Sequence, residues 1–185
     1  RPGILQMNTG SIIVGKPSLG SWLSYCVGTE NENLPSYVVM IDPRGGPRGG
    51  AGGWSAGFMP AVYQGTLFRS QGSPLLNLKR TGNVSADSQR RGLDLLSQLN
   101  RQHMESRPGY SELAARIHSY ELAYNMQTAA KEAADFAKET EKTKAEYGFN
   151  HELTADYGRK CLLARRLLER GVRYVQLYSG GGKHD

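Results

Sequence analysis

This sequence lacks long apolar runs and metal-binding cysteine pairs. No stretch approaches the roughly 18 apolar residues that a membrane-spanning helix needs, so the sequence predicts no transmembrane segment. The two cysteines, Cys26 and Cys161, lie far apart and form no Cys-x-x-Cys pair, which argues against a cysteine-based zinc site. Each falls in an apolar helical pattern, so we expect each to be a small buried hydrophobe; one long-range disulfide stays open as an alternative.

The chain carries a modest excess of positive charge. Its 23 Lys and Arg residues exceed its 17 Asp and Glu residues, for a formal net charge of +6. Residues 1–110 hold 11 basic and 6 acidic side chains, whereas residues 111–185 hold 12 and 11, so the excess is thinly spread. Nucleic-acid-binding proteins gather Lys and Arg on one face. We therefore expect no nucleic-acid partner, and a charge that at most helps to attract an anionic substrate.

The length and the residue patterns predict part of one α/β domain. A chain of 185 residues is long enough for one hydrophobic core. Apolar periodicity and capping residues predict helices over 17–27, 85–105, 111–126 and 154–170, short exposed helices within 131–147, and strands over 37–41 and 172–178. The core sides of the first two helices are expected to consist of Leu19, Trp22, Leu23 and Cys26, and of Leu93, Leu95, Leu96 and Leu99. Two strands make no stable open sheet, so further strands are expected outside this chain or in weaker segments.

A glycine-rich loop over residues 44–57 contains a motif typical of serine hydrolases. Gly53 to Gly57 reads G-x-S-x-G, which would make Ser55 a nucleophile on a strand-to-helix turn. A glycine loop precedes Ser55 where the motif needs a strand, and Pro60 limits the helix that should follow. Trp54 and Ser55 are therefore candidate residues of a substrate loop, and the alternative is a loop that Trp54 and Phe58 anchor to the core.

Residues 10–16 resemble the start of a phosphate-binding P-loop, because Gly10 and Gly15 enclose four residues and Lys16 follows directly. Pro17 stands where a P-loop needs Ser or Thr, so the segment offers no hydroxyl for a magnesium ion. The apolar residues between the glycines look buried. We therefore expect no nucleotide site in this segment.

Each predicted strand is followed by an aspartate, and a histidine also follows the second strand. Asp42 comes directly after the strand over 37–41, and His184 and Asp185 come after the strand over 172–178. Ligands of open α/β sheets bind outside the carboxyl ends of the strands, so these side chains would meet if the strands are neighbours. His184 and Asp185 are candidate ligands of a zinc, calcium or magnesium ion, with a loop-surface role as the alternative. His103, His118 and His151 have no partner at i+4, and we expect them at the surface.

The ends of the sequence favour a piece of a longer protein. The chain begins at Arg1 rather than at methionine, and residues 179–185 read as the start of a loop. No motif wholly inside the chain names its chemistry.

Several long segments carry a family resemblance over nearly the whole chain. They occur in fixed order and are Thr9–Ser11, Lys16–Trp22, Gly28–Pro35, Trp54–Thr66, Ser119–Gln127 and Gly171–Tyr178. Together they closely resemble the family called domain of unknown function 1501. That family is similar to the alkaline-phosphatase and sulfatase superfamily, whose members hydrolyse phosphate or sulfate esters at a metal centre.

The resemblance implies a fold and an activity. Residues 1–185 would form an incomplete portion of one alkaline-phosphatase-like mixed-sheet sandwich with helices on its faces, truncated at both ends. The protein would be an exported, periplasmic or extracellular, metal-dependent hydrolase of an anionic phosphate or sulfate ester. Its nucleophile region would lie upstream of Arg1 and further metal ligands downstream of Asp185, so the resemblance names no catalytic residue in this chain. The alternative is a non-catalytic binding or structural protein on the same scaffold, attached to sulfated or phosphorylated polysaccharide at a cell surface.

Overall fold

The computed structural model describes residues 2–47, 49–75, 84–106 and 111–180. The described α-helices are α1 (Pro2–Thr9), α2 (Leu19–Val27), α3 (Ala86–Glu105), α4 (Ser111–Ala134), α5 (Glu141–Glu146) and α6 (Glu152–Leu168). The strands are β1 (Tyr37–Met40), β2 (Thr66–Phe68) and β3 (Tyr174–Leu177), and short 3-10 helices are η1 (Gly50–Trp54), η2 (Ala61–Tyr63) and η3 (Phe136–Lys138). The predicted α/β class is confirmed, whereas the larger mixed sheet of the resemblance stays a prediction.

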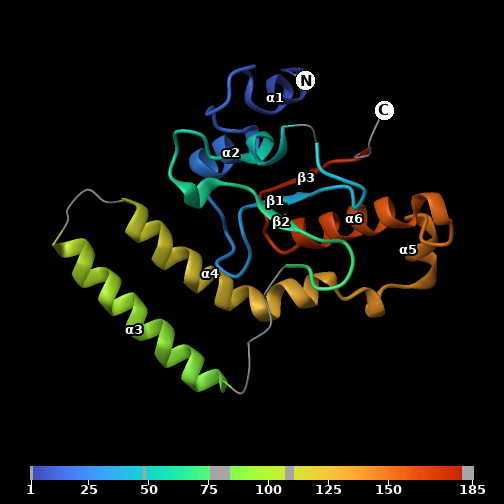
Figure 1. Ribbon diagram of the computed structural model, residues 1–185. Coiled ribbons are helices and arrows are strands. Elements are labelled where there is room, and N and C mark those ends of the chain that lie inside the picture. The colour runs from blue at the N-terminus through green and yellow to red at the C-terminus, as the bar shows by residue number, and fades with distance from the viewer. Residues whose placement is uncertain (1, 48, 76–83, 107–110, 181–185) are drawn as a thin grey trace.

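The strands form one sheet in the order β2-β1-β3, and both neighbouring pairs are parallel. Helices cover both faces of this sheet, with α1 and α2 on one side and α4 and α6 on the other (Figure 1). β1 is buried at every position because both of its faces and both of its edges are covered. Its apolar run Tyr37–Met40 is the sequence pattern of such a fully buried parallel strand.

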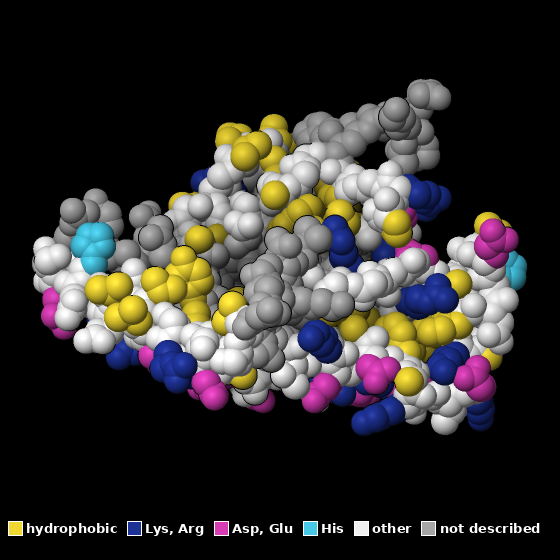
Figure 2. Space-filling model, turned by 60° about the horizontal axis from the view of Figure 1, so that its bottom comes forward, with side chains coloured by type: hydrophobic (Ala, Val, Ile, Leu, Met, Phe, Trp, Pro, Cys, Tyr) yellow, Lys and Arg dark blue, Asp and Glu magenta, His cyan; other side chains and the backbone are white. Residues whose placement is uncertain are grey.

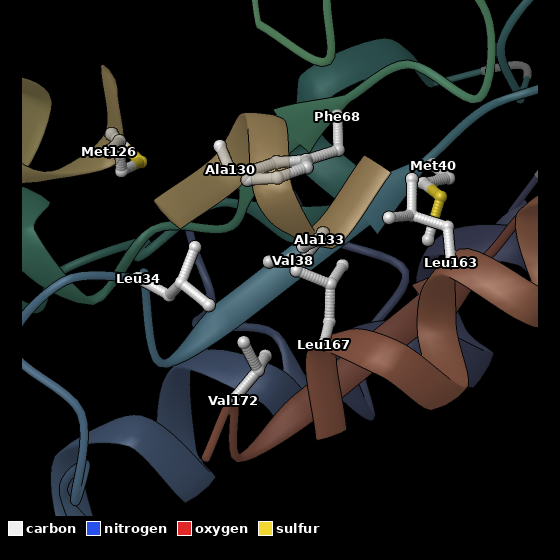
Figure 3. Close-up of a cluster of buried hydrophobic side chains, with 10 residues drawn as sticks. All are labelled: Leu34, Val38, Met40, Phe68, Met126, Ala130, Ala133, Leu163, Leu167 and Val172. Atoms are coloured by element: carbon white, nitrogen blue, oxygen red, sulfur yellow. The ribbon is translucent and has the colours of Figure 1, made fainter. Parts of the chain in front are cut away.

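The main core lies between the sheet and the helices α4 and α6. Val38 and Met40 of β1 meet Ala130 of α4 and Leu163 of α6 in this cluster (Figure 3). Its other members are Leu34, Phe68, Met126, Ala133, Leu167 and Val172. The alanines of α4 allow that helix to lie close to the sheet, which explains why an alanine-rich segment is buried here.

The opposite face of the sheet is covered by a helix that approaches through its small residues. A Cβ atom added to Gly20 of α2 would lie 2.4 Å from Cζ of Tyr37, so only glycine fits beside that buried ring. Ser21 and Ser24 complete the buried side of α2. The expectation that Leu19, Trp22 and Cys26 face the core is therefore wrong, and all three are exposed. Their large side chains point away because the sheet leaves room only for small ones.

α3 and α4 form a helical hairpin that extends from the body of the molecule (Figure 1). The predicted start of α3 is confirmed, since the Ser85 hydroxyl accepts a hydrogen bond from the Ser88 N–H. Of the four leucines predicted to face the core, Leu95, Leu96 and Leu99 are exposed and Leu93 is half-buried. Hydrophobic side chains gather at this end of the molecule in Figure 2.

The segment before α6 differs from the prediction in its boundaries. α4 continues to Ala134, well beyond the expected end near residue 126, and the short α5 follows after η3. α6 and β3 form the predicted helix, glycine turn and strand, with Gly171 at a φ of 88°.

Cys161 on α6 is half-buried and both cysteines are free, so the disulfide alternative is excluded. None of the described helices is long and apolar enough to cross a membrane.

Candidate functional site

The candidate site is the edge of the sheet where the three parallel strands end. After β1 the chain turns toward the face covered by α1 and α2. Trp54 of η1 packs on that face with Tyr37 and Val39. After β2 it turns toward the other face, where Leu75 packs against the main core. Loops that leave two neighbouring parallel strands in opposite directions open a crevice between them, and ligands of open α/β sheets bind there. We call this region the carboxyl edge.

Asp42 is the buried carboxylate of the carboxyl edge. It follows β1 and is 5% exposed. Its Oδ1 accepts hydrogen bonds from the Arg44 Nε (2.9 Å) and backbone N–H (3.0 Å), and its Oδ2 accepts one from the Arg44 Nη2 (2.9 Å). The Gly180 N–H, beyond the end of β3, also donates to Oδ2 at 3.2 Å. These hydrogen bonds, those from Arg44 above all, hold the pKa of Asp42 far below its usual range, so the carboxylate is ionised.

Asp42 therefore joins the ends of two neighbouring strands, β1 and β3, which is the arrangement that the predicted meeting of Asp42 with His184 and Asp185 requires. β1 and β3 pair in parallel register from Tyr37 with Tyr174 to Met40 with Leu177. Their carboxyl ends lie at one edge, and the contact between Asp42 and Gly180 closes it. His184 and Asp185 lie outside the described residues, so their roles stay predictions.

A second acidic group, Asp156, reaches the carboxyl edge from the first half of α6. Its Oδ1 accepts hydrogen bonds from the Ser70 hydroxyl at 3.1 Å and the Gln71 Nε2 at 2.9 Å, both in the loop after β2. Its Oδ2 forms an ion pair of 2.7 Å with the Nζ of Lys160, whose side chain is 1% exposed. Burial acts to raise the pKa of Asp156, but Lys160, Ser70 and Gln71 outweigh it and the pKa falls below its usual value.

Sequence reasoning missed Asp156 and Lys160. Spaced four residues apart on a helix, they have the pattern of an ordinary surface ion pair. Only their position opposite β2 makes them part of this edge, and β2 itself was not predicted.

Ser55 is part of a structural contact. Its carbonyl accepts hydrogen bonds from the Ser18 N–H and the Ser21 hydroxyl, each at 3.0 Å, which ties the glycine loop to the start of α2. Its hydroxyl accepts a hydrogen bond from the Gly57 N–H at 3.1 Å. Ser55 follows a 3-10 helix rather than a strand, so the nucleophile-elbow geometry is absent from this segment.

The two aromatic residues of the glycine loop behave differently. Trp54 is 8% exposed and packs against Tyr178 with 5.7 Å between ring centroids, so it anchors the loop as the alternative reading predicted. Phe58 is 66% exposed and is not an anchor. The hydroxyl of Tyr178 donates a hydrogen bond to the Gly53 carbonyl, and burial raises the pKa of Tyr178 to about 12. Tyr178 is therefore a neutral structural contact between β3 and the loop.

Three expectations concern the segment over residues 10–16 and the histidines. Residues 10–16 lie between α1 and α2, so they lack the preceding strand of a P-loop; that no nucleotide binds there stays a prediction. Ile12, Ile13 and Val14 between the glycines are 60–75% exposed, which overturns the expectation that they are buried. His103, His118 and His151 are exposed, as predicted.

The described residues do not by themselves form a metal centre. In this part of the chain no group of three or more His, Cys, Asp or Glu side chains is placed to hold an ion. Both oxygens of Asp42 are engaged by Arg44, so that carboxylate is not free to act as a ligand in this arrangement. We therefore derive no chemical step through a metal ion from these residues.

Two cavities frame the sheet. The larger, about 530 Å³, lies at the amino ends of β1 and β2, where Ser36, Tyr37 and Thr66 line it with His118 of α4. The other, about 390 Å³, lies beside the carboxyl edge between the loop after β2 and α6. Only the second is close to the charged groups described above.

The fold is that of an α/β protein with a small parallel sheet, and charged side chains gather at the carboxyl ends of its strands. The chain belongs to the family described as "Protein of unknown function (DUF1501)", whose model matches residues 1–185. No curated protein and no solved structure matches the chain.

Proposed function

We propose that this chain forms part of an exported, metal-dependent hydrolase of phosphate or sulfate esters, with the carboxyl edge as its catalytic side. The observation that supports the proposal is the convergence of charged and polar groups from separate elements at the ends of parallel strands. Asp42 follows β1, Ser70 follows β2, Gly180 follows β3, and Asp156 comes from α6. This edge is where α/β folds place their chemistry.

The metal ligands in this proposal include His184 and Asp185, which follow β3 along the chain. A divalent ion would lower the pKa of a nucleophile and neutralise charge on the ester oxygens. In this proposal the described residues fix the geometry of the carboxyl edge rather than bind the metal ion. Asp42 holds Arg44 and the chain at Gly180 in place, and Arg44, with a side chain that is 73% exposed, presents its guanidinium to solvent at this edge.

The test is hydrolysis by the product of the complete native gene. Aryl phosphate and aryl sulfate substrates are assayed before and after treatment with a chelator, and again after zinc, calcium or magnesium is restored. The proposal expects activity that is lost on chelation, is restored by a metal, and survives Ser55→Ala, since the Ser55 hydroxyl accepts a structural hydrogen bond. Activity that resists chelation but disappears in Ser55→Ala would overturn it in favour of a serine esterase.

A non-catalytic binding protein on the same scaffold is the second candidate. An exposed aromatic row beside α2 favours it, because contiguous exposed apolar surface usually marks an interaction site. Trp22 contacts Tyr25 and Phe58 with ring centroids 6.4 and 6.1 Å apart, and Tyr25 contacts Tyr63 at 5.3 Å. This candidate expects no hydrolysis under any metal, together with retention on sulfated or phosphorylated polysaccharide. Cell fractionation tests the proposed export separately.

A further inference from the structure

The cavity beside the carboxyl edge is lined by two arginines from different elements. Arg69 lies directly after β2, and Arg159 lies on α6. Ser70, Gln71 and Gly72 form one wall and Phe136 lies on another, and the cavity measures about 390 Å³. That volume lies within the range of about 300–1,000 Å³ that is usual for small-molecule sites.

Neither arginine has an acidic partner among the described residues. In the part of the chain that the structure describes, every ion pair involves other cations, and no carboxylate pairs with the guanidinium of Arg69 or Arg159. The nearby Asp156 carboxylate is occupied by Lys160, Ser70 and Gln71. Among the described residues, the cavity is therefore lined by two arginines that have no acidic partner.

The walls of the cavity are held in place by contacts that do not use the two guanidinium groups. Asp156 fixes Ser70 and Gln71, and the buried Lys160 fixes Asp156. The backbone N–H of Arg69 donates a hydrogen bond to the Pro74 carbonyl at 2.8 Å, which closes the loop after β2. A site that is already formed loses less conformational entropy when a ligand binds.

Arg159 is positioned by aromatic rings. Its guanidinium carbon lies 5.2 Å from the centroid of the Phe149 ring, and Phe149 packs edge-to-face on Phe136 at 5.7 Å. A guanidinium over a ring keeps its N–H groups available at its rim for an acceptor. Arginine is also the side chain best suited to oxyanions, because its planar fork donates two parallel hydrogen bonds.

We propose that Arg69 and Arg159 bind the phosphate or sulfate group of an organic monoester in this cavity. The cavity is larger than the oxyanion alone, which leaves space for the carbon-containing part of the ligand. This inference goes beyond the proposed function, because the group binds here whether or not the protein hydrolyses esters.

The test measures binding to the product of the complete native gene in the presence of EDTA, so that a metal centre makes no contribution. Isothermal titration calorimetry is performed with inorganic phosphate, inorganic sulfate and an aryl sulfate. We expect all three to bind, with the aryl sulfate tighter than the free anions. Arg69→Ala and Arg159→Ala should each weaken binding by about tenfold or more, as expected for the loss of a charge-assisted hydrogen-bonding partner.

The matched control is Arg101→Ala, which removes the same charge from an exposed position on α3. Arg69→Lys and Arg159→Lys keep the charge and guard against loss of folding; they should bind more weakly than wild type but better than the alanine variants. The proposal is overturned if wild type binds none of the probes, if the double alanine variant binds like wild type, or if Arg101→Ala weakens binding equally. Each of these results can occur while metal-dependent hydrolysis is intact, so the two proposals fail separately.

Discussion

At the scale of single residues, the carboxyl edge depends on Asp42. A buried carboxylate is costly unless its oxygens are hydrogen-bonded, and here both oxygens accept bonds from Arg44 while one also accepts the Gly180 N–H. Asp42 therefore fixes the geometry at the ends of β1 and β3 together.

Asp42→Asn should destabilise the protein at neutral pH by about 1–2 kcal/mol, because the amide cannot accept the Arg44 fork and the Gly180 N–H as the carboxylate does. The pKa of Asp42 is lower in the folded protein than in the unfolded one, so its stabilising effect is complete above the unfolded pKa of about 3.9 and declines as the pH falls further. Thermal unfolding at pH 7 and pH 3 measures this difference.

The control for this prediction is Asp94→Asn, whose carboxylate is 60% exposed in its pair with Arg90. Exposed pairs contribute little, so this variant should unfold close to wild type. Equal unfolding temperatures for Asp42→Asn and wild type at pH 7 would contradict the role assigned to Asp42.

At the scale of elements, the glycine loop is attached to the segment before α2. Gly57 has a φ of +57°, and a Cβ atom there would lie 2.5 Å from the backbone carbon of Lys16 and the nitrogen of Pro17. Backbone atoms cannot rotate away as side chains do. The G-x-S-x-G pattern thus reflects close packing of two loops, in which Ser55 supplies hydrogen bonds and Gly57 supplies space.

Gly57→Ala should therefore lower the free energy of unfolding by more than the backbone strain of a positive φ does, because the added Cβ also clashes with the backbone of Lys16 and Pro17. The matched control is Gly10→Ala, because Gly10 has a φ of +71° and nothing within 4 Å of the added Cβ. We expect a loss of about 1 kcal/mol for the control and at least twice that for Gly57→Ala, measured by urea unfolding. Equal losses in the two variants would show that the loop contact contributes nothing.

The same elements show what the sequence can predict. Helix starts were predicted well where a local cap decides them, as Ser85 does for α3. β2 was missed because a three-residue strand has too few side chains to show a pattern, and its pairing with β1 is a long-range effect. The buried side of α2 was predicted wrongly because periodicity identifies the apolar face, whereas the Tyr37 ring selects the side with Gly20.

The candidate site was predictable only in part. Asp42 was identified because it follows a strand with a strong signal, and the pairing of β1 with β3 confirms that its neighbours include the chain after β3. The roles of Asp156, Lys160 and Arg69 depend on where β2 lies relative to α6, which no local pattern reveals.

At the scale of the whole molecule, charged side chains gather at the carboxyl edge, whereas large exposed apolar side chains lie on α2 and α3. Trp22 and Tyr25 on α2 and Leu95 and Leu99 on α3 are 42–57% exposed. Charge does not concentrate in the same way: in Figure 2, basic and acidic side chains alternate along the visible face. This arrangement matches the thinly spread positive charge of the sequence.

Metal content shows whether His184 and Asp185, which follow β3 along the chain, are the metal ligands that we propose. The product of the complete native gene is compared with its His184→Ala/Asp185→Ala variant and with His151→Ala, in which the lost histidine is exposed and makes no capping hydrogen bond. Elemental analysis of the purified proteins should find bound zinc, calcium or magnesium in wild type and in His151→Ala, and much less in the double variant. Equal metal content in all three proteins, or none in wild type, would show that His184 and Asp185 are not metal ligands.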